Sequence, residues 1–253
     1  MVKYTDDKIT VNGVDLYRLK KTNLIGKNVY AAKSAIIGNR AIIGAEARIG
    51  NRAIIGAEAR IGNRAIIGAW TIIGAGASIG AGAIIGDRAR IGDEARIGNW
   101  AIIGAGAIIS NRASIGDETI IGAGASIGAD ASIGNRASIG ADASIVDRAS
   151  IGDRARIGAW ARIGDRARIG DEISYDIMLI GPGGSRNSYT TIWRHKDGRL
   201  RVTAGCFTGT LDELAAAVKK THGDNQHGKY YLAMIEFVKA SMEEYRQVDD
   251  EQN

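Results

Sequence analysis

The hydrophobic positions of this chain recur with a period of six residues over more than half of its length. From Asn39 the sequence reads NRAIIGAEARIG twice in succession and then begins a third time. Isoleucine occupies position 37 and every sixth position up to 169. A helix would spread these isoleucines around its whole circumference, because six is not a multiple of 3.6. The period therefore predicts short strands.

Each six-residue repeat, or hexad, has the form A-x-I-G-x-x. The tripeptide A-x-I predicts a short strand with Ala and Ile on one face and x on the other. The glycine and the two polar residues after it predict a corner, since glycine adopts backbone angles that other residues resist. Thr71 and Thr119 replace the alanine, and Ser110 and Val146 replace the glycine. One hexad cannot bury its own isoleucine, so the hexads must stack around a common core.

These hexads resemble the hexapeptide-repeat family of left-handed parallel β-helices, which includes many acyltransferases. The resemblance covers residues 23–172, because degraded hexads continue back to about Asn23. It implies three hexads per triangular coil and about eight coils. We therefore expect an all-β solenoid, a left-handed parallel β-helix, over residues 23–172. An N-terminal β-hairpin cap is expected over 1–22, and a small C-terminal α+β module over 173–253.

The expectation for the two ends comes from their own patterns. Asn12-Gly13 lies between β-rich arms and predicts a two-residue hairpin turn, which would cover the open end of the solenoid. A second hairpin is expected around Lys196-Asp197-Gly198, and GPGGS at 181–185 is expected to be a linker. A helix with a Thr210–Glu213 capping box and a last helix over 229–247 complete the module.

Two segments of this module, GCFTGT at 205–210 and THGD at 221–224, also resemble hexapeptide-repeat proteins found in phages and prophages. No established activity accompanies that resemblance, so it implies architecture alone. The regularity of the hexads is typical of an engineered or idealised member of such a group.

Composition and charge exclude several classes of protein. The net charge is +5, but sixteen arginines interleave with fourteen acidic residues between Ala35 and Glu172, which argues against a nucleic-acid groove. The single cysteine, Cys206, excludes an intrachain disulfide. No apolar run approaches the ~20 residues of a membrane span, and the first residues do not form a signal peptide. We expect a cytoplasmic protein that binds neither membrane nor nucleic acid.

With eighteen residues per coil, opposite charges at the corners face each other from one coil to the next. Examples are the pairs Arg40–Glu58, Glu46–Arg64 and Glu118–Arg136. Such exposed ion pairs contribute only ~0–1 kcal/mol each. They disfavour a slipped register, because a slip would bring like charges together.

The outward x positions carry isoleucine ladders on two of the three expected faces. A contiguous apolar stripe on a soluble protein usually marks a contact, although β-propensity alone could place isoleucine there. We expect a self-interface formed by Ile66, Ile84, Ile102 and Ile120 on one face and Ile36, Ile54 and Ile72 on another. Because enzymes of the resembled family are commonly homotrimers, the resemblance favours a trimer, with a dimer as the alternative.

Candidate catalytic chemistry is sparse. Acyl transfer needs a general base, for which the resembled family normally uses a histidine on the solenoid. Residues 23–172 contain no histidine, and no hexad is interrupted by a loop. We therefore expect no catalytic residue, no cofactor and no metal site. Our first interpretation is a non-enzymatic structural or binding protein that self-associates through its isoleucine ladders.

Two other functions remain open. All three histidines lie in the C-terminal module, so an acyltransferase-like enzyme would take its base from His222 or His227. A candidate thiol–imidazole or metal site there comprises Cys206, His222, Asp224 and His227, although a structural role is favoured. The second alternative is a binder of acidic partners through a ring of arginines near the end of the solenoid, Arg156, Arg162 and Arg168.

Overall fold

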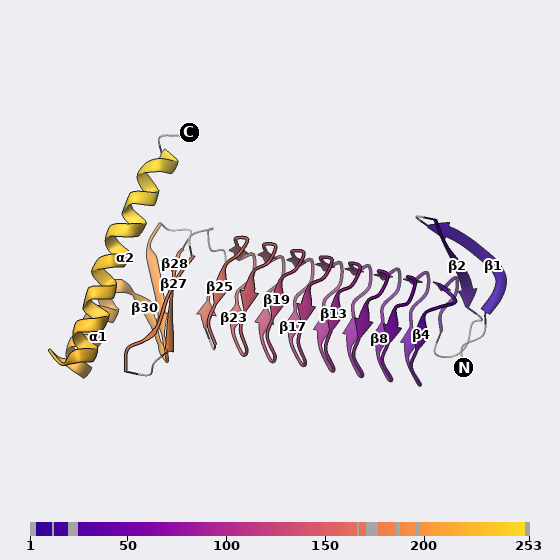
Figure 1. Ribbon diagram of the computed structural model, residues 1–253, viewed down its shortest axis with the longest axis horizontal. Helices are drawn as coiled ribbons and strands as arrows, with labels where there is room; N and C mark the ends of the chain where they lie inside the picture. Colours follow the sequence, from indigo (N-terminus) through magenta and orange to yellow (C-terminus); the bar gives the residue numbers. More distant parts are fainter. Residues whose placement is uncertain are drawn as a thin grey trace. The chain divides into compact units, whose positions relative to one another are not determined.

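The computed structural model describes residues 4–11, 13–19, 25–165, 167–170, 177–185, 188–195 and 198–250. It consists of two compact units, Met1–Tyr175 and Asp176–Asn253. The first unit contains a stack of eight coils with three short strands each (Figure 1). From β3 to β23, each strand of the coils pairs in parallel with the strand eighteen residues later, as in the register of Ile72 with Arg90. The predicted β-solenoid with three hexads per coil is confirmed.

The strands of the coils form three parallel sheets. Sheet A contains β3 (Tyr30–Ala31), β6 (Arg48–Ile49), β9 (Ile66–Ile67), β12 (Ile84–Ile85), β15 (Ile102–Ile103), β18 (Ile120–Ile121), β21 (Ser138–Ile139) and β24 (Arg156–Ile157). Sheet C contains β4 (Ile36–Ile37), β7 (Ile54–Ile55), β10 (Ile72–Ile73), β13 (Arg90–Ile91), β16 (Ile108–Ile109), β19 (Ser126–Ile127), β22 (Ser144–Ile145) and β25 (Arg162–Ile163). Sheet B contains β5 (Ile42–Ile43), β8 (Arg60–Ile61), β11 (Ser78–Ile79), β14 (Arg96–Ile97), β17 (Ser114–Ile115), β20 (Ser132–Ile133), β23 (Ser150–Ile151) and β26 (Arg168–Ile169).

The solenoid core is made of the repeated alanine and isoleucine side chains. The inward isoleucines from Ile43 to Ile169 are at most 3% exposed. Thr71 and Thr119 are also fully buried in alanine positions, and their hydroxyls donate to the carbonyl oxygens of Gly86 and Gly134. The two exceptions to the alanine column therefore satisfy their polar groups within the core.

The glycine of the hexad has a different role from the one that the sequence suggested. A Cβ at Gly80 would lie 2.4 Å from the carbonyl carbon of Gly98 in the next coil, so glycine is needed for close approach. Positive φ angles fall instead on the last residue of the hexad, as at Arg40 (61°) and Trp160 (63°). The expectation that glycine supplies unusual backbone angles was therefore wrong for this column, because contact between coils limits the space.

The corner residues connect successive coils. The expected ion pairs Arg40–Glu58, Arg64–Glu46 and Arg136–Glu118 form at 3.2, 2.9 and 2.9 Å, and Arg112–Asp130 joins them at 2.9 Å. Hydrogen bonds from the Arg136 guanidinium lower the pKa of Glu118 below its ordinary value. The predicted charge register is confirmed.

A second set of contacts between coils comes from the polar residue after the glycine. Its side-chain oxygen accepts a hydrogen bond from a backbone N–H one coil earlier. Examples are the Ala75 N–H on Oδ1 of Asp93 and the Ala81 N–H on Oδ1 of Asn99, both at 2.8 Å. Because these bonds tie corners of adjacent coils together, they also fix the register.

The N-terminal hairpin consists of β1 (Tyr4–Val11) and β2 (Val14–Leu19). Val11 lies opposite Val14, and Asn12 of the expected turn is outside the described residues. Strand β2 also pairs antiparallel with β3, with Tyr17 opposite Ala31. The hairpin therefore extends sheet A at its first coil and covers an open strand edge there.

The second unit is an antiparallel sheet with two helices. The sheet order is β27 (Ile177–Gly183), β28 (Ser188–Arg194), β29 (Leu200–Ala204) and β30 (Phe207–Thr210). Helices α1 (Leu211–His222) and α2 (Gln226–Asp250) supply most of the buried core, including Leu214, Val218, Ile235 and Val238. Ile192 and Val202 complete this core from the sheet.

Two sequence expectations for this unit have clear outcomes. The capping box is confirmed: the Thr210 side chain accepts from the Glu213 backbone N–H, and the Glu213 side chain accepts from Thr210. The segment 181–185 is not a linker, because it ends β27 and forms a turn. Residues 196–197 of the other expected turn lie outside the described residues.

None of the helices in the described part of the chain is long and apolar enough to span a membrane.

Candidate functional site

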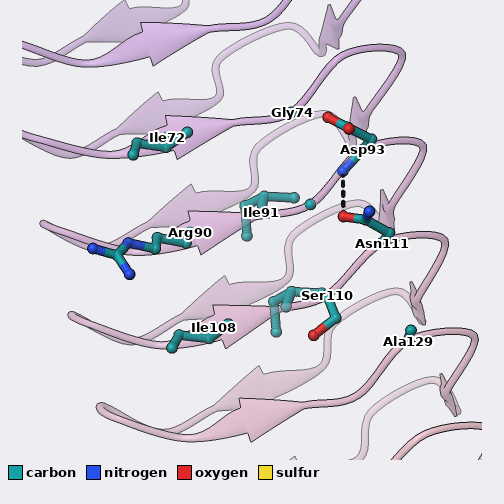
Figure 2. A pocket seen from close by; sticks show the side chains of 11 residues that line it. Ile72, Gly74, Arg90, Ile91, Asp93, Ile108, Ser110, Asn111 and Ala129 are labelled. Atoms are coloured by element: carbon teal, nitrogen blue, oxygen red, sulfur yellow. Dashed lines mark hydrogen bonds between the residues drawn. The ribbon is translucent and has the colours of Figure 1, made fainter.

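Two interruptions of the regular surface lie in adjacent coils of the solenoid. Arg90 interrupts the outward isoleucine ladder of sheet C, and Ser110 is one of the two residues that replace the corner glycine. Both line an open groove with a volume of about 510 Å³ on the face of sheet C. Figure 2 shows this groove, whose lining comes from four successive coils and which we call the sheet C groove. Its lining residues are Ile72, Gly74, Arg90, Ile91, Gly92, Asp93, Ile108, Ile109, Ser110, Asn111 and Ala129.

The apolar side of the groove surrounds Arg90. Arg90 pairs in register with Ile72 in the coil before and with Ile108 in the coil after, and these isoleucines are 41% and 40% exposed. In the part of the chain that the structure describes, no ion pair or hydrogen bond engages the Arg90 guanidinium. A cationic group thus lies between two apolar side chains on the surface.

The polar side of the groove is the corner that leads from sheet C to sheet B. The Asn111 Oδ1 accepts the Asp93 backbone N–H at 3.0 Å, which leaves the Asn111 amide NH₂ as a donor. Figure 2 shows this bond at the corner and shows the Arg90 side chain extending away from it. Ser110 adds a hydroxyl to the lining of the groove, where a glycine would present only its backbone.

The expected self-interface residues are all on the surface of the solenoid. On sheet A, Ile66, Ile84, Ile102 and Ile120 are 39–48% exposed and form an uninterrupted ladder in register. On sheet C, Ile36, Ile54 and Ile72 are also exposed. The corner between these two sheets carries Ala105-Gly106 and Ala123-Gly124 in successive coils. No large side chain projects from the solenoid there, and we call this part the low corner.

The expected cluster of the C-terminal module is partly assembled. His222 ends α1 and His227 lies in the first turn of α2, and their ring centroids are 5.8 Å apart. The His222 ring also stacks on the buried Tyr231 ring at 5.9 Å, whereas His227 is exposed. Asn225 holds the start of α2, because its Oδ1 accepts the backbone N–H of His227 and of Gly228.

The other proposed members do not join this pair. Cys206 is exposed in the turn between β29 and β30, and no described contact links it to the histidines. Among the described residues, no three His, Cys, Asp or Glu side chains are grouped so as to hold a metal ion. The arginines Arg156, Arg162 and Arg168 begin β24, β25 and β26, one on each sheet.

Sequence reasoning did not identify the sheet C groove as a site. The signal was present, because Arg90 departs from the ladder and Ser110 departs from the glycine column in consecutive coils. Each departure was visible alone, and only the eighteen-residue register places the two side by side.

Comparison with protein families identifies the repeat. The model described as "Bacterial transferase hexapeptide (six repeats)" matches residues 112–147 and 130–165. Residues 112–165 are therefore hexapeptide repeats of this family. A second model, "GMPPB C-terminal domain", matches residues 25–115 of this hexapeptide-repeat protein. A comparison with curated protein sequences finds no match, so the resemblance to phage proteins stays a prediction.

Solved structures of acyltransferases are similar to this hexapeptide-repeat protein. The UDP-N-acetylglucosamine acyltransferase from Bacteroides fragilis is 19% identical, with a TM-score of 0.52 over 86% of this chain and 90% of that chain. The likeness confirms the left-handed parallel β-helix. The enzyme of the same name from Francisella novicida is 24% identical, with a TM-score of 0.29 over 56% of this chain. Only 62% of that enzyme's chain is covered, which is less than two thirds.

These matches contradict the interpretation of the chain as a non-enzymatic structural or binding protein. The matching family model is that of a transferase, and the solved structure that shares the fold is an acyltransferase. The interpretation relied on the lack of histidine in residues 23–172. That argument was incomplete, because a base need not lie on the solenoid of an enzyme that carries histidines in another unit.

Proposed function

We propose that this chain is an acyltransferase that transfers an acyl group from a thioester to a sugar-nucleotide acceptor. One observation carries the proposal: the likeness to the Bacteroides fragilis enzyme extends over 86% of this chain, so it takes in more than the solenoid alone. The printed name of that enzyme supplies UDP-N-acetylglucosamine as the first acceptor to test.

The chemistry requires one proton transfer. An acceptor hydroxyl or amine attacks the carbonyl carbon of the thioester, the C–S bond breaks, and the thiolate leaves and takes up the acceptor's proton from the base. A base must remove the acceptor proton as the new bond forms. His227 is the best candidate for this base, because its side chain is exposed and next to the His222 ring. His222 is a positioning residue in this proposal, since its ring packs against Tyr231.

The acyltransferase is proposed to be a homotrimer. The supporting feature is the ladder Ile66, Ile84, Ile102 and Ile120 on sheet A, which is exposed in the single chain and uninterrupted. Ile36, Ile54 and Ile72 on sheet C flank the same edge of the solenoid. The low corner at Gly106 and Gly124 would let neighbouring chains approach closely beside Ile102 and Ile120.

Catalysis is tested by mass-spectrometric detection of acylated product from UDP-N-acetylglucosamine and a series of acyl thioesters. With the best donor, we expect His227→Gln to lower kcat by about 10²–10⁴-fold, the usual contribution of a general base, with little change in KM. His195→Gln, in the same unit but outside the histidine pair, is the control and should leave kcat unchanged. Absence of product with every donor, or an equal loss in both variants, would overturn the proposal.

A further inference from the structure

We infer that the sheet C groove binds an organic anion, with a carboxylate or phosphate on Arg90 and an attached apolar chain along the groove. This inference does not depend on the acyltransferase proposal. It rests on the combination of an unengaged cation, apolar neighbours in exact register and hydrogen-bond donors at the far end of one cavity.

The position of Arg90 favours an anion rather than water alone. Its guanidinium is fully charged at neutral pH and presents a planar set of donors that fits carboxylate and phosphate oxygens. Arg90 is exposed and lies in register between Ile72 and Ile108, so a ligand bound to its guanidinium would have apolar side chains on both sides. Other solenoid arginines, such as Arg64 and Arg136, already engage carboxylates.

The shape of the groove favours an attached apolar chain. Ile72 and Ile108 offer it apolar contacts beside Arg90, and Gly74, Gly92 and Ala129 carry no bulky side chain that would block the way to the corner. Gly92 cannot be larger, because a Cβ there would lie 2.3 Å from the Asn111 Oδ1. The volume of about 510 Å³ is within the range of small-molecule sites, roughly 300–1,000 Å³.

The corner fixes the orientation of the ligand. Asp93 places a carboxylate at the end of the groove opposite the Arg90 guanidinium, so an anionic group is repelled there and attracted at Arg90. The Ser110 hydroxyl and the Asn111 amide can donate to a neutral oxygen further along the ligand. The groove runs toward the corner between sheets C and B, away from the Gly106 edge, and Ile72 is the one residue that it shares with the proposed self-interface.

The test is calorimetric titration of the full chain with octyl phosphate, octanoate and inorganic phosphate, each below any micelle-forming concentration. Arg90→Ile restores the isoleucine ladder, so the variant should fold. We expect saturable binding of octyl phosphate or octanoate, weakened at least about tenfold by Arg90→Ile, the usual scale for loss of a charged hydrogen bond. Ser110→Gly, which restores the repeat, should weaken binding less. The two amphiphiles show whether phosphate or carboxylate is preferred.

The matched control is Arg96→Ser, which removes the same charge from sheet B between Ser78 and Ser114. It should leave the affinity unchanged. The inference fails if neither amphiphile binds, if Arg90→Ile binds as tightly as the wild type, or if Arg96→Ser loses as much. Inorganic phosphate binding as tightly as octyl phosphate would overturn the apolar part of the site. None of these outcomes depends on whether acyl transfer is detected.

Discussion

Two corner positions of each hexad meet different steric demands at the residue scale. The glycine after the isoleucine packs against the backbone of the next coil, whereas the last residue of the hexad adopts a positive φ. That last residue is usually charged or aromatic, as at Arg88 (59°) and Trp100 (59°). A left-handed conformation costs a residue with a Cβ roughly 1–2 kcal/mol. Most corners therefore hold strain that the stacking of coils must offset.

Replacing Gly106 by alanine isolates this strain. Gly106 has a φ of 68°, and a Cβ there would meet no atom of its own chain within 4 Å, so within one chain Gly106→Ala changes the backbone preference alone. We expect the free energy of unfolding, measured in urea, to fall by about 1 kcal/mol.

The companion variant is Gly82→Ala, where a Cβ would lie 2.4 Å from the Trp100 ring. It should destabilise the protein more than Gly106→Ala, and adding Trp100→Ala should remove the excess. Equal stability of the wild type and Gly106→Ala would mean that the corner holds no strain.

At the scale of elements, helix α1 depends on its first turn. Thr210 and Glu213 exchange hydrogen bonds across the N-terminus, and Leu211, Leu214 and Val218 face the core. The bond from the Thr210 backbone is the main reason that the pKa of Glu213 lies below its ordinary value. A lowered pKa means that the folded state favours the ionised carboxylate. Its stabilising effect is present above the ordinary pKa of glutamate and is lost as the pH falls through the folded-state pKa.

Removing the cap should therefore loosen α1 in a pH-dependent way. Thr210→Ala should cost about 1 kcal/mol of helix stability. Glu213→Gln should reduce the protection of the α1 amides against hydrogen exchange at neutral pH, with the difference from wild type shrinking in acid. The control is Asp212→Asn, which removes an equal charge from an exposed ion pair with Lys239 and leaves the cap intact. A pH-independent difference for Glu213→Gln would contradict this account.

For the whole molecule, the distribution of outward side chains separates the three sheets. Sheets A and C carry isoleucine ladders in the first half of the solenoid, whereas sheet B carries mainly serine and arginine. An exposed apolar ladder is costly to leave in water, since burial gains roughly 25 cal/mol per Å². The difference between the sheets gives the solenoid one side suited to self-association.

The solution mass tests the proposed trimer. Light scattering on the wild type should give the mass of three chains, and Ile84→Arg/Ile102→Arg should give a folded monomer, because charges would replace two central members of the sheet A ladder. Ser114→Arg/Ser132→Arg, on sheet B, should keep the wild-type mass. A monomeric wild type would contradict the proposal.

Much of the solenoid could be predicted from the sequence, because each hexad repeats the same buried Ala–Ile pair and the charged corners fix the register. Glu118 and Arg136 were paired correctly, because the resemblance to hexapeptide-repeat proteins implied a coil of eighteen residues. The sheet C groove was missed, since Arg90 and Ser110 were not considered together, although the eighteen-residue register places them in adjacent coils. The four-stranded sheet was also missed in part, because Gly183 and Gly184 resemble a linker although the Tyr230 and Tyr231 hydroxyls pack against them.

The alternation of buried and outward positions has a consequence for how such a protein changes over generations. Every hexad presents the same interior, so gaining or losing one would keep the isoleucine column filled. It would also move each later outward residue to the neighbouring sheet, turning the downstream surface by a third of a revolution. Gaining a whole coil would lengthen the stack by about 4.8 Å and leave the faces aligned. Duplication in units of six thus rearranges the surface, and duplication in units of eighteen extends it, without altering the core on which folding depends.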